Sequence, residues 1–235
     1  MRVMRFLKWV GRLFALVLVV GIVAALILAG NGYKLYTEAV KEKPVEQTVE
    51  AIRSGENYTK LADMPKTYLD AVVAAEDHRF YEHGGIDLLA IGRALFNDIK
   101  AMSFVEGGST ITQQLAKNLF FTQEKEVTRK VAEVFMAFDL ENRYSKEEIL
   151  ELYLNSIYFG NGCYSVKEAS LSYFQKEPGQ MTDYESTLLA GIPNAPSVYA
   201  LTENPDLAGQ RQKQVVDLMI KYGYLTQQDA VAIFA

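Results

Sequence analysis

The sequence predicts a mainly α-helical domain preceded by a single N-terminal transmembrane helix. Three observations support this fold class. An uncharged apolar run follows a basic N-terminus, apolar residues recur at helical spacing beyond it, and capping residues precede several of the periodic segments. No segment shows the sustained alternation of apolar and polar residues that a half-buried strand requires, and no internal repeat is visible.

The N-terminal segment is predicted to be an uncleaved membrane anchor. Residues 13–33 are uncharged, and their most apolar part, 13–30, would span roughly 27 Å as a helix, close to the hydrocarbon thickness of a bilayer. The only charges before this run are positive: Arg2, Arg5, Lys8 and Arg12. Residues 1–12 are therefore expected in the cytoplasm, and the remainder on the outer face of the cell membrane. A cleaved signal peptide is the alternative, but the apolar run is long for one and no clear cleavage site follows it.

Residues 34–59 are polar and contain the helix breakers Pro44 and Gly55, so we expect a stalk leading into a domain of residues 60–235. Pro65 opens the first periodic segment of that domain, which ends at Glu76.

Further helices are predicted in order along the domain. Residues 86–102 have a helical apolar period, and Ser109 or Thr110 is expected to cap the helix after them. An amphipathic run over 125–143 follows. The remaining helices are expected to begin near Ser145 and Thr182, each with a glutamate three residues later, and near Asn204 and Thr226.

The composition and charge of the chain limit the functions that it can be expected to have. A chain of 235 residues with 49% hydrophobic content can build one ample core beyond an anchor. The net charge is −5. Without the four cations of the N-terminus, 20 basic and 29 acidic residues remain, which gives a net charge of −9. Nucleic acid is therefore not an expected partner, because phosphate neutralisation requires a basic face. Cys163 is the only cysteine, so no intrachain disulfide can form.

The segment from Glu76 to Gly85 combines adjacent carboxylates with aromatic and imidazole groups. Two solvated acids at a helix end are the ordinary interpretation of Glu76 and Asp77. Partial burial near Phe80 and His83 would instead raise the pKa of a carboxylate and make it a usable general base. A hydrogen-bonded His83 that orders the loop is favoured over a metal ligand, because the spacing of zinc ligands is missing.

The segment 107–114 places two glycines before hydroxyl and amide side chains at a predicted helix start. It is typical either of an anion-binding cradle or of an ordinary capped turn. A cluster of cations follows it: Lys117, Lys125, Arg129 and Lys130. Glu133 either pairs with Arg129 on one helix face or acts as a second active-site carboxylate.

Other residues of these segments are expected to be structural. Tyr153 and Asn155 have the character of core and helix-end residues. Four apolar residues are expected in the core for the most part, although some could contact lipid: Phe104, Leu119, Phe120 and Phe121.

Taken together, these segments resemble the motifs of the peptidoglycan glycosyltransferases, glycosyltransferase family 51. The first motif corresponds to 76–85, the second to 107–118, the third to 129–133 and the fourth to 146–155.

A fifth region is looser. Gly162, Ala169 and the pair Tyr173-Phe174 fit, whereas Ser165 and Ser170 stand where glycine and alanine are usual. The sequence has no room for the transpeptidase domain of class A penicillin-binding proteins, so it resembles the monofunctional members.

The resemblance implies a lysozyme-like fold with a flexible jaw near the membrane, and polymerisation of lipid II with inversion at the donor sugar. By position, Glu76 would be the general base, with Asp77, Phe80 and His83 shaping its site. The donor sugar and diphosphate would be held by Ser109, Thr110, Gln114, Lys117 and Asn118, helped by Lys125, Arg129 and Lys130. Glu133 would position the donor or a divalent cation, magnesium or manganese. No organic cofactor is implied.

The implied partners are lipid II, the growing glycan chain, the lipid bilayer, and transpeptidases or other wall-synthesis proteins. Two alternatives remain open. A murein-cleaving muramidase or lytic transglycosylase could share a similar fold, and Glu185-Ser186 superficially resembles the glutamate-serine pair of the latter. A capping role after Thr182 is the stronger interpretation of Glu185. The third class is a non-catalytic membrane-anchored scaffold.

Overall fold

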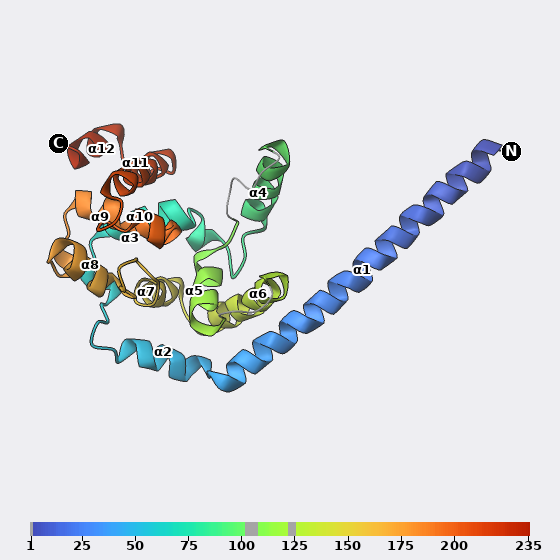
Figure 1. The fold of residues 1–235 in the computed structure, drawn as a ribbon, viewed down its shortest axis with the longest axis horizontal. Coiled ribbons are helices and arrows are strands. Elements are labelled where there is room, and N and C mark those ends of the chain that lie inside the picture. Colours follow the sequence, from blue (N-terminus) through green and yellow to red (C-terminus); the bar gives the residue numbers. More distant parts are fainter. Residues whose placement is uncertain (1, 102–107, 122–125) are drawn as a thin grey trace.

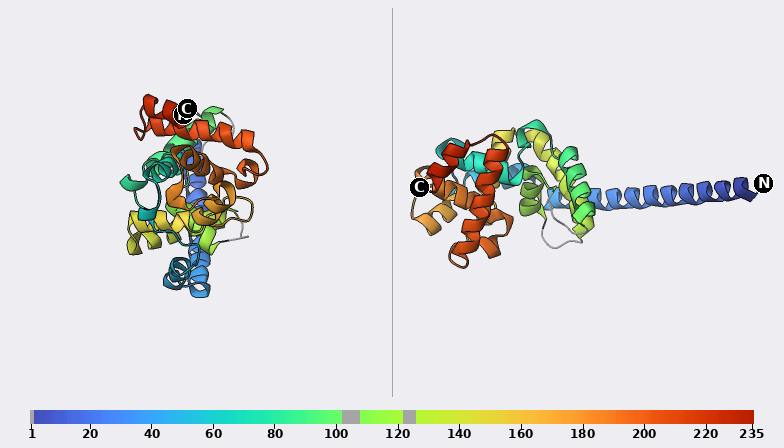
Figure 2. Two further views of the ribbon diagram at one scale, coloured as in Figure 1. Left: turned by 90° about the vertical axis from the view of Figure 1, so that its left-hand side faces the viewer. Right: turned by 90° about the horizontal axis from the view of Figure 1, so that it is seen from above.

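The computed structural model describes residues 2–101, 108–121 and 126–235 (Figure 1). Every regular element within these ranges is a helix or a short 3₁₀ turn, and no strand occurs in them. The predicted mainly α class is therefore confirmed. A helical body carries one long helix, α1, that projects far beyond it (Figure 1 and the right-hand view of Figure 2).

Helix α1 spans Arg2–Glu42 and is longer than the predicted anchor. It contains an apolar stretch that is long enough to cross a membrane, and none of that stretch is buried against the body. The C-terminal part of α1 packs closely against α6. A Cβ on Gly32 would lie 2.4 Å from Cγ1 of Val131, so only glycine permits this close approach. The Tyr36 hydroxyl donates to Oδ2 of Asp139 at 3.1 Å. The anchor is thus joined to the domain by packing and by a hydrogen bond.

The segment predicted as a stalk contributes to the folded body. Residues Val45–Arg53 form α2, whose Val45 and Val49 are buried in the core. Arg53 forms an ion pair with Glu148 of α7, with 2.6 Å between Nη2 and Oε1. The sequence prediction overlooked the apolar side chains one helical turn apart, which give this short helix a face to bury.

The body contains the predicted helices and two further short ones. Their bounds are α3 Lys66–Glu76, α4 Leu88–Ala101, α5 Ile111–Phe120, α6 Glu126–Arg143, α7 Lys146–Leu154, α8 Val166–Phe174, α9 Asp183–Gly191, α10 Pro196–Tyr199, α11 Pro205–Lys221 and α12 Gln227–Ile233. Helices α8 and α10 were not predicted, because their apolar periods are too short to stand out.

The predicted caps are confirmed. Thr110, Ser145 and Thr182 each accept a hydrogen bond from the backbone three residues later and form complete capping boxes. Thr226 does the same with Asp229. These bonds involve neighbours in sequence, which explains why the sequence alone locates the starts of α5, α7, α9 and α12.

Helices α3 and α5 form the centre of the body. Helix α3 packs against α9 and α11, whereas α5 packs against α6 and α7. Tyr68, Ile111 and Leu115 are fully buried, and the predicted core positions Phe120 and Phe121 are buried as well. Leu119 packs against the core, while Phe104 lies outside the described residues. The ends of these two central helices carry the first and second motifs.

Ser165 and Ser170, which stand where the family usually has glycine and alanine, each form a hydrogen bond with the nearby backbone. The Ser165 hydroxyl accepts from the backbone N–H of Glu168 and caps α8. The Ser170 hydroxyl donates to the carbonyl of Lys176 at 2.7 Å. Each serine therefore satisfies a backbone group next to α8.

Candidate active site

Glu76 is the last residue of α3 and lies beside α5. Nε2 of Gln114 donates to Oε2 of Glu76 at 2.8 Å, and the hydroxyl of Tyr153 donates to Oε1 of the same glutamine at 3.1 Å. The Glu76 residue is half-buried, but its Oε1 is buried and has no hydrogen-bond partner. One carboxylate oxygen is thus held in place and the other is free to accept a hydrogen bond.

Burial raises the pKa of Glu76 above its ordinary value. The hydrogen bond from Gln114 and the positive charges of Arg211 and Lys117 favour the ionised form, but they do not cancel the effect of burial. A carboxyl group with a raised pKa and one free oxygen is suited to accept a proton.

Asp77 joins the first and second motifs. Its Oδ2 accepts from the backbone N–H of Ile111 at 3.1 Å, and its Oδ1 lies 2.8 Å from Nε2 of His83. Nδ1 of His83 lies 2.6 Å from the carbonyl oxygen of Gly84. Both ring nitrogens contact acceptors, so the imidazolium, which donates from both, fits this site best. The prediction that His83 orders the loop by hydrogen bonding is confirmed.

The stability of the domain is expected to depend on the charge of His83. Burial by itself lowers the pKa of His83, but the hydrogen bonds to Asp77 and Gly84 and the charge of Asp77 outweigh it and raise the pKa. The stabilisation is therefore fully present below about pH 6.5, the ordinary histidine pKa, and is lost as pH rises through the higher folded pKa. Thermal melts across this range should show a melting temperature that falls as the pH rises.

A His83→Gln variant serves as the comparison, because it cannot gain a charge. Its melting temperature should be lower than that of the wild type at pH 6 and should vary less between pH 6 and 9. A wild-type profile parallel to that of the variant would contradict the role of the charged pair.

A carboxylate of Asp87 also lies close to Asp77 and His83, a geometry that could in principle suit a metal ion. The oxygens of Asp87 are already used: Oδ1 accepts from the N–H groups of Leu89 and Ala90, and Oδ2 pairs with Arg79 at 3.0 Å. Hydrogen bonds within the loop therefore account for this cluster.

A cationic pocket of about 450 Å³ lies between α5 and α6. It is lined by Ser109, Gln113, Gln114, Lys117, Val127, Arg129, Lys130 and Glu133. Nζ of Lys130 donates to Oγ of Ser109 at 2.6 Å and to Oε2 of the buried Glu133 at 2.8 Å. Nε of Arg129 lies 3.6 Å from Oε1 of Glu133 and has no hydrogen-bond partner. Three cations against one carboxylate give the pocket a positive charge that suits an anionic ligand.

A second pocket of about 220 Å³ lies on the other side of α5, and we call it the amide pocket. It is lined by Gln114, Lys117, Asn118, Tyr153, Ile157, Tyr158, Pro193, Asn194 and Pro196. Gln114 and Lys117 line both pockets, and Gln114 holds the Glu76 carboxylate. The two pockets therefore meet beside the candidate base.

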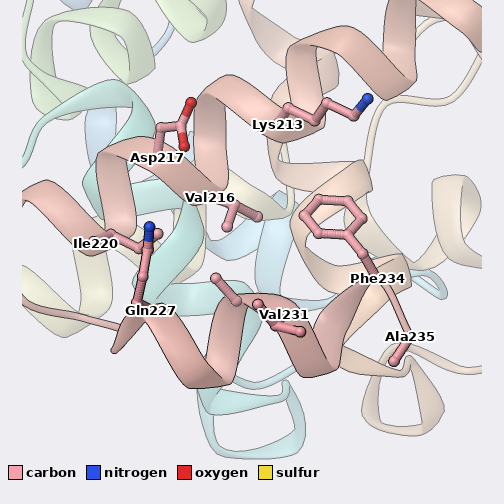
Figure 3. A pocket seen from close by; sticks show the side chains of 9 residues that line it. Lys213, Val216, Asp217, Ile220, Gln227, Val231, Phe234 and Ala235 are labelled. Carbon is pink, nitrogen blue, oxygen red and sulfur yellow. The ribbon is translucent and has the colours of Figure 1, made fainter.

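A larger groove of about 570 Å³ lies elsewhere, between α11 and α12. Val216, Val231 and Phe234 face one another across it, while Lys213 and Asp217 lie along α11 (Figure 3). None of the motif residues lines this groove. Volume alone would favour this groove as the active site. The charged and polar residues beside Glu76 favour the cationic pocket and the amide pocket instead.

The predicted site residues fall into three groups. Those that line a pocket are Ser109, Gln114, Lys117, Asn118, Arg129, Lys130 and Glu133. Glu76, Asp77, Phe80, His83 and Thr110 are buried or hydrogen-bonded within the frame and line neither pocket, although Glu76 accepts a hydrogen bond from Gln114, which lines both. Lys125 and Gly107 lie outside the described residues.

Sequence reasoning missed several residues near the site, three of which bear on its chemistry. Tyr158 and Asn194 line the amide pocket, and Arg211 influences the charge of Glu76. Helix α11 packs against α3, and Nε of Arg211 is buried without a hydrogen-bond partner. No local pattern marks these residues, because only the packing of distant segments brings them to Glu76.

Glu185 has the capping role that its position predicts. Its Oε2 accepts from the backbone N–H of Thr182 at 2.8 Å, and both of its oxygens lie 2.8 Å from Nζ of Lys176. Ser186 is fully buried. This pair is therefore part of the start of α9, which weakens the case for a lytic transglycosylase.

The chain is similar to known proteins over most of its length. Residues 42–220 match a family described as transglycosylase. Penicillin-binding protein 1F of Bacillus subtilis (strain 168) is 48% identical over 169 residues, which are 72% of this chain and 24% of that protein. Penicillin-binding protein 1A of Neisseria flavescens is 43% identical over 171 residues, which are 73% of this chain and 21% of that protein. The chain thus spans about a quarter or less of the length of these relatives.

Proposed function

Because this chain belongs to the transglycosylase family, glycosyltransferase family 51, we propose that it is a peptidoglycan glycosyltransferase that polymerises lipid II into linear glycan strands. The observation that carries this proposal is the meeting of the cationic pocket and the amide pocket at Gln114 and Lys117, beside the buried carboxylate of Glu76. Such a site can hold a diphosphate on one side and a sugar on the other.

In the proposed reaction, the 4-hydroxyl oxygen of an acceptor GlcNAc attacks C1 of the MurNAc at the reducing end of the growing chain. Glu76 accepts the proton of that hydroxyl, through the oxygen that has no partner. The bond from C1 to the diphosphate oxygen breaks, its electron pair leaves with undecaprenyl diphosphate, and the configuration inverts from α to β. General-base assistance of this kind is worth about 10²–10⁴-fold in rate.

The leaving group explains the cations. A diphosphate departs as a stable anion, so it needs charge neutralisation more than protonation. Lys117, Arg129 and Lys130 would supply that neutralisation from the cationic pocket. One base with a cationic pocket is therefore sufficient, unlike the acid and base pair of an inverting hydrolase.

A divalent cation at Glu133 stays a prediction. The described residues around this carboxylate do not by themselves fit a metal site, because Oε2 is bound by Lys130 and Oε1 lies beside Arg129. Magnesium usually requires further oxygen ligands, which a bound diphosphate would provide. We therefore assign no step of the reaction to a metal.

The apolar helix α1 and the relatives indicate a membrane-anchored protein. We further propose that residues 1–12 lie in the cytoplasm and the domain on the outer face, because the charges before the apolar run are positive. The anchor would hold the domain beside substrates that are themselves attached to lipid. Transpeptidases and other wall-synthesis proteins remain proposed partners.

The decisive experiment gives the full-length protein labelled lipid II and separates the products by gel electrophoresis, with and without a chelator. We expect a series of glycan polymers that chelation slows but does not abolish, because the lysine and arginine side chains remain. Loss of all polymer on chelation would contradict the assignment of charge neutralisation to these side chains. Release of soluble muropeptides from polymerised glycan, without chain growth from lipid II, would instead support a murein-cleaving enzyme.

A further inference from the structure

Two exposed tyrosines continue the amide pocket outward. Tyr158 lines the pocket and is 36% exposed, while Tyr164 is 62% exposed. Their ring centroids are 4.8 Å apart, with 35° between the ring planes. A ligand that extends from the pocket across Tyr158 would therefore also meet Tyr164.

The loop that carries these tyrosines is held in place. The N–H of Phe159 donates to the carbonyl of Cys163 at 2.8 Å, and the hydroxyl of Tyr173 donates to the carbonyl of Phe159 at 2.9 Å. Gly160 has φ +81°, and a Cβ there would lie 2.9 Å from the carbonyl oxygen of Pro196. The N–H of Tyr164 donates to Oε2 of Glu168 at 2.6 Å. The backbone beneath the rings is therefore fixed before any ligand binds.

The chemistry of the amide pocket selects its ligand. Among its described lining residues, Lys117 alone is a charged side chain, and it also belongs to the cationic pocket. The remaining described walls consist of amides, prolines, tyrosines and Ile157, which offer hydrogen bonds beside apolar surface. This lining suits the hydroxyl and acetamido groups of neutral sugars better than a diphosphate.

The volume and the position of the pocket indicate a long ligand. About 220 Å³ is less than the roughly 300–1,000 Å³ of pockets that enclose a whole small molecule. Helices α7, α8 and α10 lie on the side of α5 away from the free end of α1 (Figures 1 and 2). The loop between α7 and α8, which carries both tyrosines, is therefore on the side of the body away from that end.

We propose that Tyr158 and Tyr164 form an exit platform on which sugar rings of the growing glycan strand stack as they leave the amide pocket. This inference rests on the proposed polymerase function and adds a role for residues outside the motifs. The platform holds the polymer between successive additions, so it determines product length more than the rate of a single transfer.

The test compares product lengths from labelled lipid II for the full-length wild type and Tyr164→Ala. We expect the variant to consume lipid II at a rate close to that of the wild type but to release strands about two- to tenfold shorter, the range of one aromatic contact. Tyr164→Phe retains the ring and should restore wild-type lengths. Tyr184→Ala is the matched control, because Tyr184 is also exposed and paired with an aromatic ring, Phe234, but lines neither pocket at Glu76.

Binding provides the second readout. Lipid-free glycan oligomers, with and without stem peptides, are titrated against wild type and Tyr164→Ala, and both oligomers should bind the variant about two- to tenfold more weakly. Unchanged strand length in Tyr164→Ala would overturn the platform, as would a loss of affinity confined to oligomers that carry peptides. A wild-type protein that forms no polymer would instead refute the polymerase function itself.

Discussion

Glu76→Gln is expected to abolish glycan polymerisation while the domain remains folded. Glutamine keeps the size of the side chain and can still contact Gln114, but it cannot accept the proton of the acceptor hydroxyl. The loss should be at least the general-base contribution of about 10²–10⁴-fold, measured as the initial rate of lipid II consumption. Glu203→Gln, at an exposed position, is the control and should retain the wild-type rate.

The pH dependence gives an independent check on Glu76. Because burial raises its pKa, the wild-type rate should fall on acidification at a higher pH than the value of about 4.3 for an ordinary glutamate. A raised folded pKa also means that ionised Glu76 costs stability at neutral pH, a cost that disappears as the pH falls and the carboxylate is protonated. Glu76→Gln should therefore melt at the same or a higher temperature than the wild type at pH 7, and the difference should shrink toward pH 4.

Two outcomes would separate the remaining function classes. A folded Glu76→Gln protein that elongates glycan at near the wild-type rate would refute the role of Glu76 as the base. A variant that is inactive in vitro but fully supports wall synthesis in cells would indicate the non-catalytic scaffold.

Lys117→Ala is expected to have the second-largest effect. Lys117 lines both pockets, and its charge favours the ionised form of Glu76. Removing it should weaken neutralisation of the departing diphosphate and lower the rate by about 10²–10³-fold, as for other lost electrostatic contacts at a reacting anion. The acidic limb of the pH–rate profile should also move to higher pH, because one of the charges that lower the pKa of Glu76 is gone.

The measurement pairs the rate with titration of a phosphoglycolipid analogue of the donor and with a thermal melt. Affinity should fall while the melting temperature stays close to that of the wild type. Lys117→Arg should recover part of the affinity and restore the position of the acidic limb. Lys213→Ala, in the groove of Figure 3, removes a lysine away from the site and should change none of these quantities. Equal effects of Lys117→Ala and Lys213→Ala would contradict the specific role of Lys117.

Local interactions explain what could be predicted from the sequence. The caps at Thr110 and Ser145 use bonds to residues three positions away, so the starts of α5 and α7 follow from the sequence. The apolar period of α3 leads directly to Glu76 at its end. Arg129 and Lys130 share α6 with Glu133, where spacings of four and three residues bring the side chains together.

The predictions that failed or remained incomplete involve longer distances. Residues 34–59 have the composition of a stalk, but Val45 and Val49 find a surface on the body, and no pattern within the segment reveals that surface. The role of Asp77 was foreseen only as shaping the site. Its bond to the backbone of Ile111 joins α3 to a different helix, α5, which the sequence alone does not reveal.

The sequence by itself determined the helical class, the apolar N-terminal helix, the starts of α5, α7, α9 and α12 and the identity of the candidate base, because each depends on neighbours along the chain. Only the tertiary structure decided that the two pockets meet at Gln114 and Lys117, and that Arg211 and Tyr158 belong to the site. Arg211 reaches Glu76 because α11 packs against α3, and the amide pocket lies beside Glu76 because Gln114 of α5 donates a hydrogen bond to that carboxylate. Such packing is set by the burial of side chains from distant segments, which no local pattern records.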